Sequence, residues 1–367
     1  MNNNIFPKLK IGRLSPKIPI IQGGMGVGIS LSKLASAVAN QGGIGVIAAT
    51  GIGMVDIIPG KNARQSNIIT LREEIKKARE LSNGIIGVNV MMALIDCENL
   101  IRVSMEEKVD VIFLGAGLPR KFKDPELMND IFKSNTLLIP IVSSGRATNI
   151  IFEYWKDHYK RVPEAVVVEG PLAGGHLGYK PAQIEDPNYS LESIVKDVVS
   201  VINKFEVELN IEIPVIAGGG IYTGEDIYRL FQLGAKGVQM GTRFVATHEC
   251  DASDIFKQTY VDANEEDVQI IKSPVGLPGR AVINQFIKDV RAGEKKPFNC
   301  PWKCLHTCDY KTAPYCIFHA LTNAKKGLMD KGFAFAGANA SRIDKIISVK
   351  ELIDSLMQEY ALVAVKA

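Results

Sequence analysis

Eight short apolar segments recur along the first 240 residues, and they constrain the fold more than any other feature. They lie at residues 18–22, 45–48, 84–90, 109–114, 137–142, 165–168, 213–217 and 237–240. Several are apolar without interruption, as parallel strands buried on both faces must be. Amphipathic, helix-like segments separate them, at residues 31–40, 71–81, 100–107, 125–132, 149–157, 191–205 and 224–233. This alternation predicts an α/β fold, a (β/α)8 TIM barrel. A doubly wound open sheet is the alternative, because periodicity alone does not show closure.

The apolar series ends near residue 240, which divides the chain into two parts. We expect residues 1–244 to form the barrel and residues 245–367 to form a C-terminal lid or extension that completes it. The extension has helical patterns but no comparable series of strands, and it contains a cysteine cluster at residues 300–316. The polar residues 61–65, shortly after Pro59, are expected to form a loop insertion between the second strand and its helix.

Composition excludes several classes of function. The formal net charge is only +3, from 43 basic and 40 acidic residues, so there is no electrostatic case for binding nucleic acid or a membrane surface. We find no run of 18 apolar residues and no signal-peptide pattern at the N-terminus. The sequence therefore predicts a cytoplasmic protein that acts on a small molecule, with a homodimer left open.

Two glycine-rich turns follow the seventh and eighth predicted strands. The first contains Gly218, Gly219 and Gly220, with Thr223 as a candidate helix N-cap, and the second contains Gln239, Met240, Gly241, Thr242 and Arg243. In TIM barrels the loops after these two strands often bind phosphate through exposed backbone N–H groups. Two such turns on consecutive strands therefore predict a phosphate-bearing ligand.

The loop after the sixth predicted strand places one histidine among glycines. It begins at Glu169 and runs through Gly174 and Gly175 to His176, with Gly178 beyond. An imidazole near neutral pH can accept or donate a proton, which suits general acid–base catalysis at the ends of the strands. A structural or solvent-exposed loop histidine is the alternative, and we assign that role to the other four histidines.

The ends of the first and third predicted strands complete the candidate site. Gly23, Gly24, Met25 and Gly26 follow the first strand, where bare backbone would let a flat ligand approach closely. A plain tight turn would have the same sequence. Asn89 lies inside the third apolar segment, where a buried polar side chain needs a partner. It would bind a ligand or join neighbouring strands.

Taken in order, these elements resemble the nitronate monooxygenase (2-nitropropane dioxygenase-like) family, whose superfamily includes the FMN-dependent enoyl-acyl-carrier-protein reductases. The likeness extends over residues 15–290, and its most specific element is Ala173-Gly174-Gly175-His176. The resemblance implies a barrel that binds FMN. Gly23, Gly24, Met25 and Asn89 would line the flavin ring, Gly175 would approach it, and His176 would lie at its reactive face. Gly218, Gly219, Gly220, Gly241 and Thr242 would bind the phosphate, and Gln239, Met240 and Glu169 complete the set assigned to the cofactor.

Two activities follow from this resemblance. A nitronate monooxygenase oxidises alkyl nitronates with dioxygen to a carbonyl compound and nitrite, and His176 would position the substrate or remove a proton from a neutral nitroalkane. An enoyl-acyl-carrier-protein reductase uses NAD(P)H to reduce an enoyl thioester, with His176 assisting at the thioester. We favour the first. A flavin-binding protein without turnover, and a barrel enzyme for a sugar or nucleotide phosphate without flavin, are further alternatives.

Four cysteines depart from the family pattern. Cys300, Cys304 and Cys308 are spaced by four residues, as on one face of a helix that Pro301 would begin, and Cys316 follows. Four thiolates could bind zinc or an iron–sulfur cluster. Packing of small buried side chains and redox-sensitive thiols are the alternatives, because these spacings match no established ligand motif.

Overall fold

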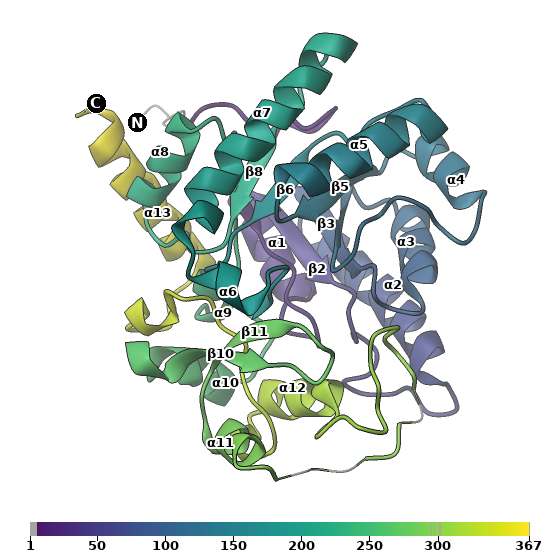
Figure 1. The fold of residues 1–367 in the computed structure, drawn as a ribbon, viewed down its shortest axis with the longest axis vertical. Coiled ribbons are helices and arrows are strands. Elements are labelled where there is room, and N and C mark those ends of the chain that lie inside the picture. The colour runs from purple at the N-terminus through teal and green to yellow at the C-terminus, as the bar shows by residue number, and fades with distance from the viewer. Residues whose placement is uncertain (1–5, 295, 297, 301, 367) are drawn as a thin grey trace.

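A computed structural model describes residues 6–294, 296, 298–300 and 302–366, and it contains a closed barrel of eight parallel strands (Figure 1). The order around the barrel is β1-β2-β3-β4-β5-β6-β8-β9, and β9 pairs with β1 to close it. The predicted TIM barrel is therefore confirmed and the open sheet is excluded. The strands are β1 (Ile20–Gln22), β2 (Ile44–Ala48), β3 (Ile85–Met91), β4 (Val111–Gly115), β5 (Leu137–Val142), β6 (Val166–Glu169), β8 (Val215–Gly218) and β9 (Gly237–Met240).

Helices surround this barrel on the outside, as the amphipathic segments predicted (Figure 1). The eighth place in the ring, between α8 and α1, is taken by α13 (Val349–Ala364) at the far end of the chain. The C-terminal segment thus returns to the barrel and packs on it. The other outer helices are α1 (Ser32–Asn40), α2 (Ala63–Leu81), α3 (Cys97–Glu106), α4 (Leu127–Lys133), α5 (Gly145–Tyr159), α7 (Leu191–Leu209) and α8 (Gly224–Gln232).

The interior of the barrel is a packed core of its own. Val46, Phe113 and Ile139 belong to it, and Leu9 and Ile11 from the N-terminal segment pack against the same cluster. Dispersion and burial of these side chains hold the strands together from inside. A filled interior leaves ligand binding to the loops beyond the strand ends.

One sequence-based expectation for the barrel was wrong. Residues 61–65 do not form a loop insertion, because α2 already begins at Ala63. Asn62 caps this helix by accepting a hydrogen bond from the Gln65 N–H, and the Gln65 side chain accepts one from the Asn62 N–H. This reciprocal cap satisfies two N–H groups at the start of the helix. The polar residues of the segment therefore begin a helix and do not form a loop.

Within the described residues the extension contains one hairpin that the sequence analysis did not identify, and this hairpin is not a series of strands comparable to that of the barrel. β10 (Val268–Lys272) and β11 (Pro278–Val282) form an antiparallel hairpin, and β11 also pairs with β7 (Gly175–His176). β10 is only partly buried, so its sequence lacks the continuous apolar run of the barrel strands. The search for continuous apolar runs therefore did not identify the hairpin.

The rest of the extension gathers near this hairpin. α10 (Asp254–Val261), α11 (Gln285–Arg291) and α12 (Ile317–Lys325) lie with β10 and β11 at the lower end of the molecule in Figure 1. Every helix in the described ranges is too short or too polar to span a lipid bilayer.

Candidate active site

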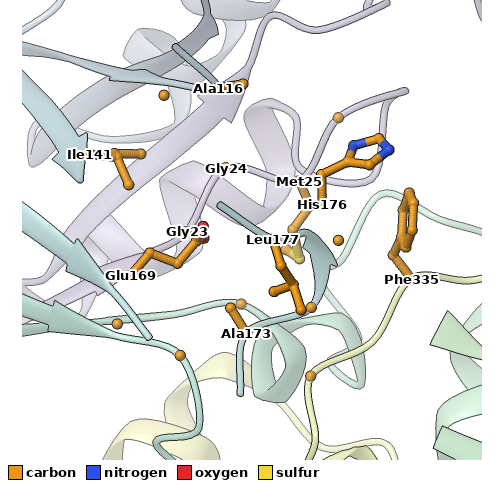
Figure 2. A pocket seen from close by; sticks show the side chains of 18 of the residues that line it. Gly23, Gly24, Met25, Ala116, Ile141, Glu169, Ala173, His176, Leu177 and Phe335 are labelled. Carbon is orange, nitrogen blue, oxygen red and sulfur yellow. The ribbon is translucent and has the colours of Figure 1, made fainter. Parts of the chain in front are cut away.

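A cavity of about 650 Å³ opens where the barrel strands end. Its walls include residues 23–27, 115–118, 172–178, 218–222 and 239–243, which follow strands β1, β4, β6, β8 and β9. The extension contributes further lining, including Tyr260, Leu277 and Phe335, the last of which is labelled in Figure 2. The structure brings together in this cavity every residue predicted for the cofactor and His176: Gly23, Gly24, Met25, Asn89, Glu169, Gly175, Gly218, Gly219, Gly220, Gln239, Met240, Gly241 and Thr242.

Three polar side chains reach the cavity from strand ends, namely Asn89 on β3, Glu169 on β6 and Gln239 on β9. Figure 2 shows the Glu169 side chain directed toward Gly23. Gly24 packs so closely on β3 that a Cβ there would lie 2.3 Å from the Asn89 Cβ. Only glycine fits at this position, so bare backbone borders the cavity beside these polar groups.

Glu169 is enclosed by protein, and burial raises its pKa to about 7. Its backbone carbonyl accepts a hydrogen bond from the Tyr179 hydroxyl. Desolvation disfavours the charged form of a carboxyl group, so Glu169 is protonated below pH 7 and charged above it. A carboxyl group that can change its charge near neutral pH therefore faces the cavity.

The glycine-rich turns lie next to these groups, since Gly218 pairs with Glu169 and the Gly23 N–H donates a hydrogen bond to the Met240 carbonyl. Gly219 and Gly220 have φ values of +90° and +84°, which other residues rarely adopt. Thr223 caps α8 as predicted, because its hydroxyl oxygen accepts a hydrogen bond from the Asp226 N–H at 3.1 Å. The Thr242 hydroxyl oxygen accepts a hydrogen bond from the Gly337 N–H at 2.9 Å, which attaches the extension to this end.

A partly buried guanidinium lies beside these turns. Arg243 Nη1 donates a hydrogen bond to the Tyr222 carbonyl at 2.7 Å, and the Arg243 guanidinium lies 4.1 Å from the centre of the Tyr222 ring. Arg342 lies at the same distance from that ring. Burial lowers the pKa of Arg243, but an arginine stays charged in proteins. This end of the cavity therefore carries positive charge.

His176 is held by the extension. Its Nε2 lies 2.7 Å from Ser273 Oγ, in the turn between β10 and β11, and its ring packs edge-on against Phe335 at 5.0 Å. Burial lowers its pKa to about 4, so the imidazole is neutral at physiological pH. Our sequence analysis did not identify Ser273 or Phe335, because both are about 100 or more residues from His176 and lack a motif.

Arg280 on β11 fixes the loop that leads to His176. Its Nη1 donates hydrogen bonds to the carbonyl oxygens of Pro171 at 2.5 Å and Ala173 at 2.9 Å, and the side chain is buried. A buried cation is costly unless it is hydrogen-bonded, and these two carbonyl groups accept hydrogen bonds from Arg280. Arg280 was also missed, because a single arginine in a strand carries no sequence signal.

The cysteine segment differs from its prediction. Cys300, Cys304 and Cys308 are not on a helix, since residues 298–300 and 302–316 form loops and turns with one β-bridge, while Pro301 lies outside the described residues. Cys316 precedes α12, and all four thiols are free. Within the described ranges no three His, Cys, Asp or Glu side chains are arranged to hold a metal ion. The structure therefore does not support the predicted iron–sulfur cluster or zinc ion.

The fold and the cavity define a (β/α)8 barrel with a ligand site at the strand ends. The sequence matches the nitronate monooxygenase family over residues 8–359, so the chain belongs to this family. Membership identifies an FMN-dependent oxidoreductase and agrees with the resemblance seen in the sequence.

Individual proteins show the same relationship. The chain is 28% identical over 314 residues to a probable nitronate monooxygenase of Staphylococcus aureus (strain Newman), covering 76% of this chain and 78% of that protein. FabK from Thermotoga maritima is 27% identical, with a TM-score of 0.73 and coverage of 96% and 95% of the two chains. Nitroalkane oxidase from Streptomyces ansochromogenes shares the fold at 22% identity and a TM-score of 0.70, with 95% and 98% coverage.

The cavity fits FMN, the cofactor that the family implies. Gly175 has open space where a Cβ would stand, so its backbone borders the cavity directly. Successive left-handed glycines, as at Gly219 and Gly220, expose N–H groups of the kind that bind anions. Positive charge at Arg243 lies near them, and polar side chains reach the cavity from β3, β6 and β9. The polar side chains match the flat flavin ring of FMN, and the glycine N–H groups with Arg243 match its phosphate.

We expect Gly241→Asp to raise the Kd for FMN at least about 100-fold, because a second negative charge near the phosphate costs several kcal/mol. Gly241 has an ordinary φ of −111°, and a Cβ there would contact only Met25, at 3.7 Å, so the fold accepts a side chain. Titration of apoprotein with FMN, followed by flavin fluorescence, measures the effect. Gly241→Ala is the matched control. An unchanged Kd in Gly241→Asp would place the phosphate elsewhere.

We expect FMN affinity to fall as the pH rises through about 7, since deprotonation of Glu169 places a negative charge in the cavity with the anionic ligand. The Kd should rise by about tenfold between pH 6 and pH 8 if binding requires the protonated carboxyl. Glu169→Gln keeps the shape and removes the titration, so its Kd should change much less. Equal pH dependence in both proteins would contradict this role.

Proposed function

We propose that this FMN-dependent oxidoreductase oxidises alkyl nitronates with dioxygen to a carbonyl compound and nitrite. The observation that carries the proposal is the neutral, enclosed His176, held by Ser273 at the FMN-sized cavity of a nitronate monooxygenase family member. The relatives named as a probable nitronate monooxygenase and a nitroalkane oxidase support the choice of substrate.

The residues divide the work of the reaction. When bound, FMN supplies the redox chemistry, and the protein provides orientation and electrostatics. His176 is neutral, so it can hydrogen-bond an oxygen of the nitro group or accept a proton from the α-carbon of a neutral nitroalkane. Ser273 fixes the ring orientation through Nε2, and Arg280 holds the loop. The apolar side chains of the cavity keep water away from the reacting atoms.

An enoyl-acyl-carrier-protein reductase that uses NAD(P)H is the second candidate. The observation in its favour is the long apolar lining that the extension adds to the cavity, which includes Leu305, Ile317 and Phe318. Such a wall accommodates an acyl chain as well as an alkyl chain. His176 would then hydrogen-bond the thioester carbonyl.

Anaerobic reduction of the flavin by different donors separates these functions. We expect an alkyl nitronate to bleach the flavin absorbance rapidly, and NADH and NADPH to leave it unchanged. Oxygen uptake and nitrite release then confirm the overall reaction. Bleaching by a nicotinamide alone would establish the second candidate. A bound flavin that no donor reduces would indicate a binding protein, and a protein that remains colourless after addition of FMN would exclude flavin chemistry.

We expect His176→Ala to retain FMN and to oxidise neutral nitroalkanes about 10² to 10⁴ times more slowly, the usual contribution of a general base. Preformed nitronates need no proton removal, so their rate should fall much less. In the wild type, titration of His176 should leave the rate with neutral nitroalkanes constant from pH 8 to pH 5. The rate should fall near pH 4, where the imidazole becomes protonated.

Ser273 provides the matched test of ring orientation. Ser273→Thr keeps the hydroxyl and should retain most of the rate, whereas Ser273→Ala should lower kcat about tenfold without changing the Kd for FMN.

The His176 prediction has its own contradicting outcome. A His176→Ala variant that is equally slow with nitroalkane and nitronate would remove the base role and leave only substrate positioning.

A further inference from the structure

Four of the six cysteines gather in one part of the extension and have no role in the proposed reaction. Cys300, Cys304, Cys308 and Cys316 are free and partly exposed, whereas the other two cysteines are free and buried. Thiols that are free and accessible can be oxidised reversibly when two of them lie close together. The arrangement of the two segments that carry Cys304 and Cys316 is therefore of interest.

These two segments pack on neighbouring strand ends of the barrel. The Cys304 carbonyl accepts a hydrogen bond at 3.1 Å from the Ile95 N–H, in the loop after β3. Phe318, at the start of α12, packs on the backbone of Gly51, after β2, where a Cβ would lie 2.2 Å from its ring. β2 and β3 are paired in the barrel, so the loops that follow them are neighbours. Cys304 and Cys316 are thereby brought to the same wall of the cavity.

A side-chain contact joins the two segments directly. The Trp302 ring packs edge-on against the His319 ring of α12, with 4.6 Å between the ring centres. Trp302 is two residues before Cys304, and His319 is three residues after Cys316. Burial raises the pKa of Cys304 to about 12, and the nearby Cys316 raises it further. The two thiols are thus close enough for the charge of one to act on the other.

We propose that Cys304 and Cys316 form a reversible disulfide pair, which a low-molecular-weight disulfide oxidises and a dithiol reduces. The Cys316 thiolate attacks one sulfur of the oxidant and releases a first thiol. Cys304 then loses its proton and attacks the Cys316 sulfur of the mixed disulfide, which releases a second thiol. Two cysteine thiols are oxidised to one disulfide, and the oxidant is reduced to two thiols. The site does not depend on which substrate the flavin oxidises.

Cys316 is the better candidate for the first attack. Burial raises its pKa, but the N–H groups of Phe318 and His319 at the start of α12 act in the opposite direction. Backbone N–H groups at a helix N-terminus favour a thiolate. Cys304 has no such groups from a helix, since its segment consists of loops and turns with one β-bridge. Cys304 therefore acts second, as the resolving thiol.

The disulfide would act on the wall of the ligand site. Leu305 directly follows Cys304, Ile317 directly follows Cys316, and both line the cavity. Residues 305–315 between the two cysteines contain turns, loops and one β-bridge. A cross-link over such a segment removes conformational freedom from the chain and ties the two lining residues together. The oxidation state of the pair is therefore coupled to the rigidity of this wall.

Incubation of the FMN-loaded enzyme with glutathione disulfide tests the pair. We expect the intact mass to fall by two hydrogen atoms, and a tryptic digest to contain residues 304–311 linked to residues 312–325. Dithiothreitol should reverse both changes. The cross-link should form about tenfold faster at pH 8 than at pH 7, because both pKa values are raised and the thiolate fraction grows with pH. An unchanged mass, or a mixed disulfide with glutathione that goes no further, would overturn the proposal.

A variant that lacks the other two thiols of the segment isolates the pair. Cys300→Ser combined with Cys308→Ser leaves Cys304 and Cys316, and it should form the same cross-link at an unchanged rate. Oxidation of this variant should raise its thermal unfolding midpoint by about 5 °C, the effect of closing a short loop in a chain of this size. A cross-link that forms in urea but not in the native variant, or one that lowers the midpoint, would show that the two sulfur atoms are not neighbours in the fold.

Discussion

The register between β1 and β9 is the constraint on which the site depends. Ile20 lies opposite Val238 and Gln22 opposite Met240, which closes the barrel. Beyond the last pair, the Gly23 N–H donates a hydrogen bond to the Met240 carbonyl at 2.8 Å. Closure therefore brings the first glycine turn beside the last one. In an open sheet with the same strands at its two edges, these turns would be far apart and no common cavity would form.

The position of His176 depends on a second set of pairings, made by the extension. β7 consists only of Gly175 and His176, and its partner is β11, with Gly279 opposite His176. The same hairpin provides Ser273 at its turn and Arg280 beneath the loop. A short strand has little stability of its own, so the orientation of the histidine is determined by residues about 100 positions later in the chain.

The sequence was sufficient to predict the barrel and the positions of its strands, and it singled out strand-end residues that the structure places along one cavity. This was possible because the information is local: a strand end, a glycine turn and a histidine lie within a few residues of one another, as at Gly175 and His176. Ser273, Arg280 and Phe335 could not be found in this way, because only tertiary contacts connect them to the site. The spacing of Cys300 and Cys304 was misleading for the same reason. A spacing of four fits a helix, but the described residues here form loops and turns, and Leu305 makes a β-bridge with Leu94.

The phosphate-binding turns and the histidine are connected by one short piece of the extension. Phe335 packs against the His176 ring, and the Gly337 N–H donates a hydrogen bond to Thr242 two residues later. Asn339 Nδ2 then donates to the Gly220 carbonyl at 2.7 Å. Residues 335–339 thus contact the general base candidate at one end and both glycine-rich turns at the other. The position of Phe335 beside His176 therefore depends on the same short segment that is hydrogen-bonded to both glycine-rich turns.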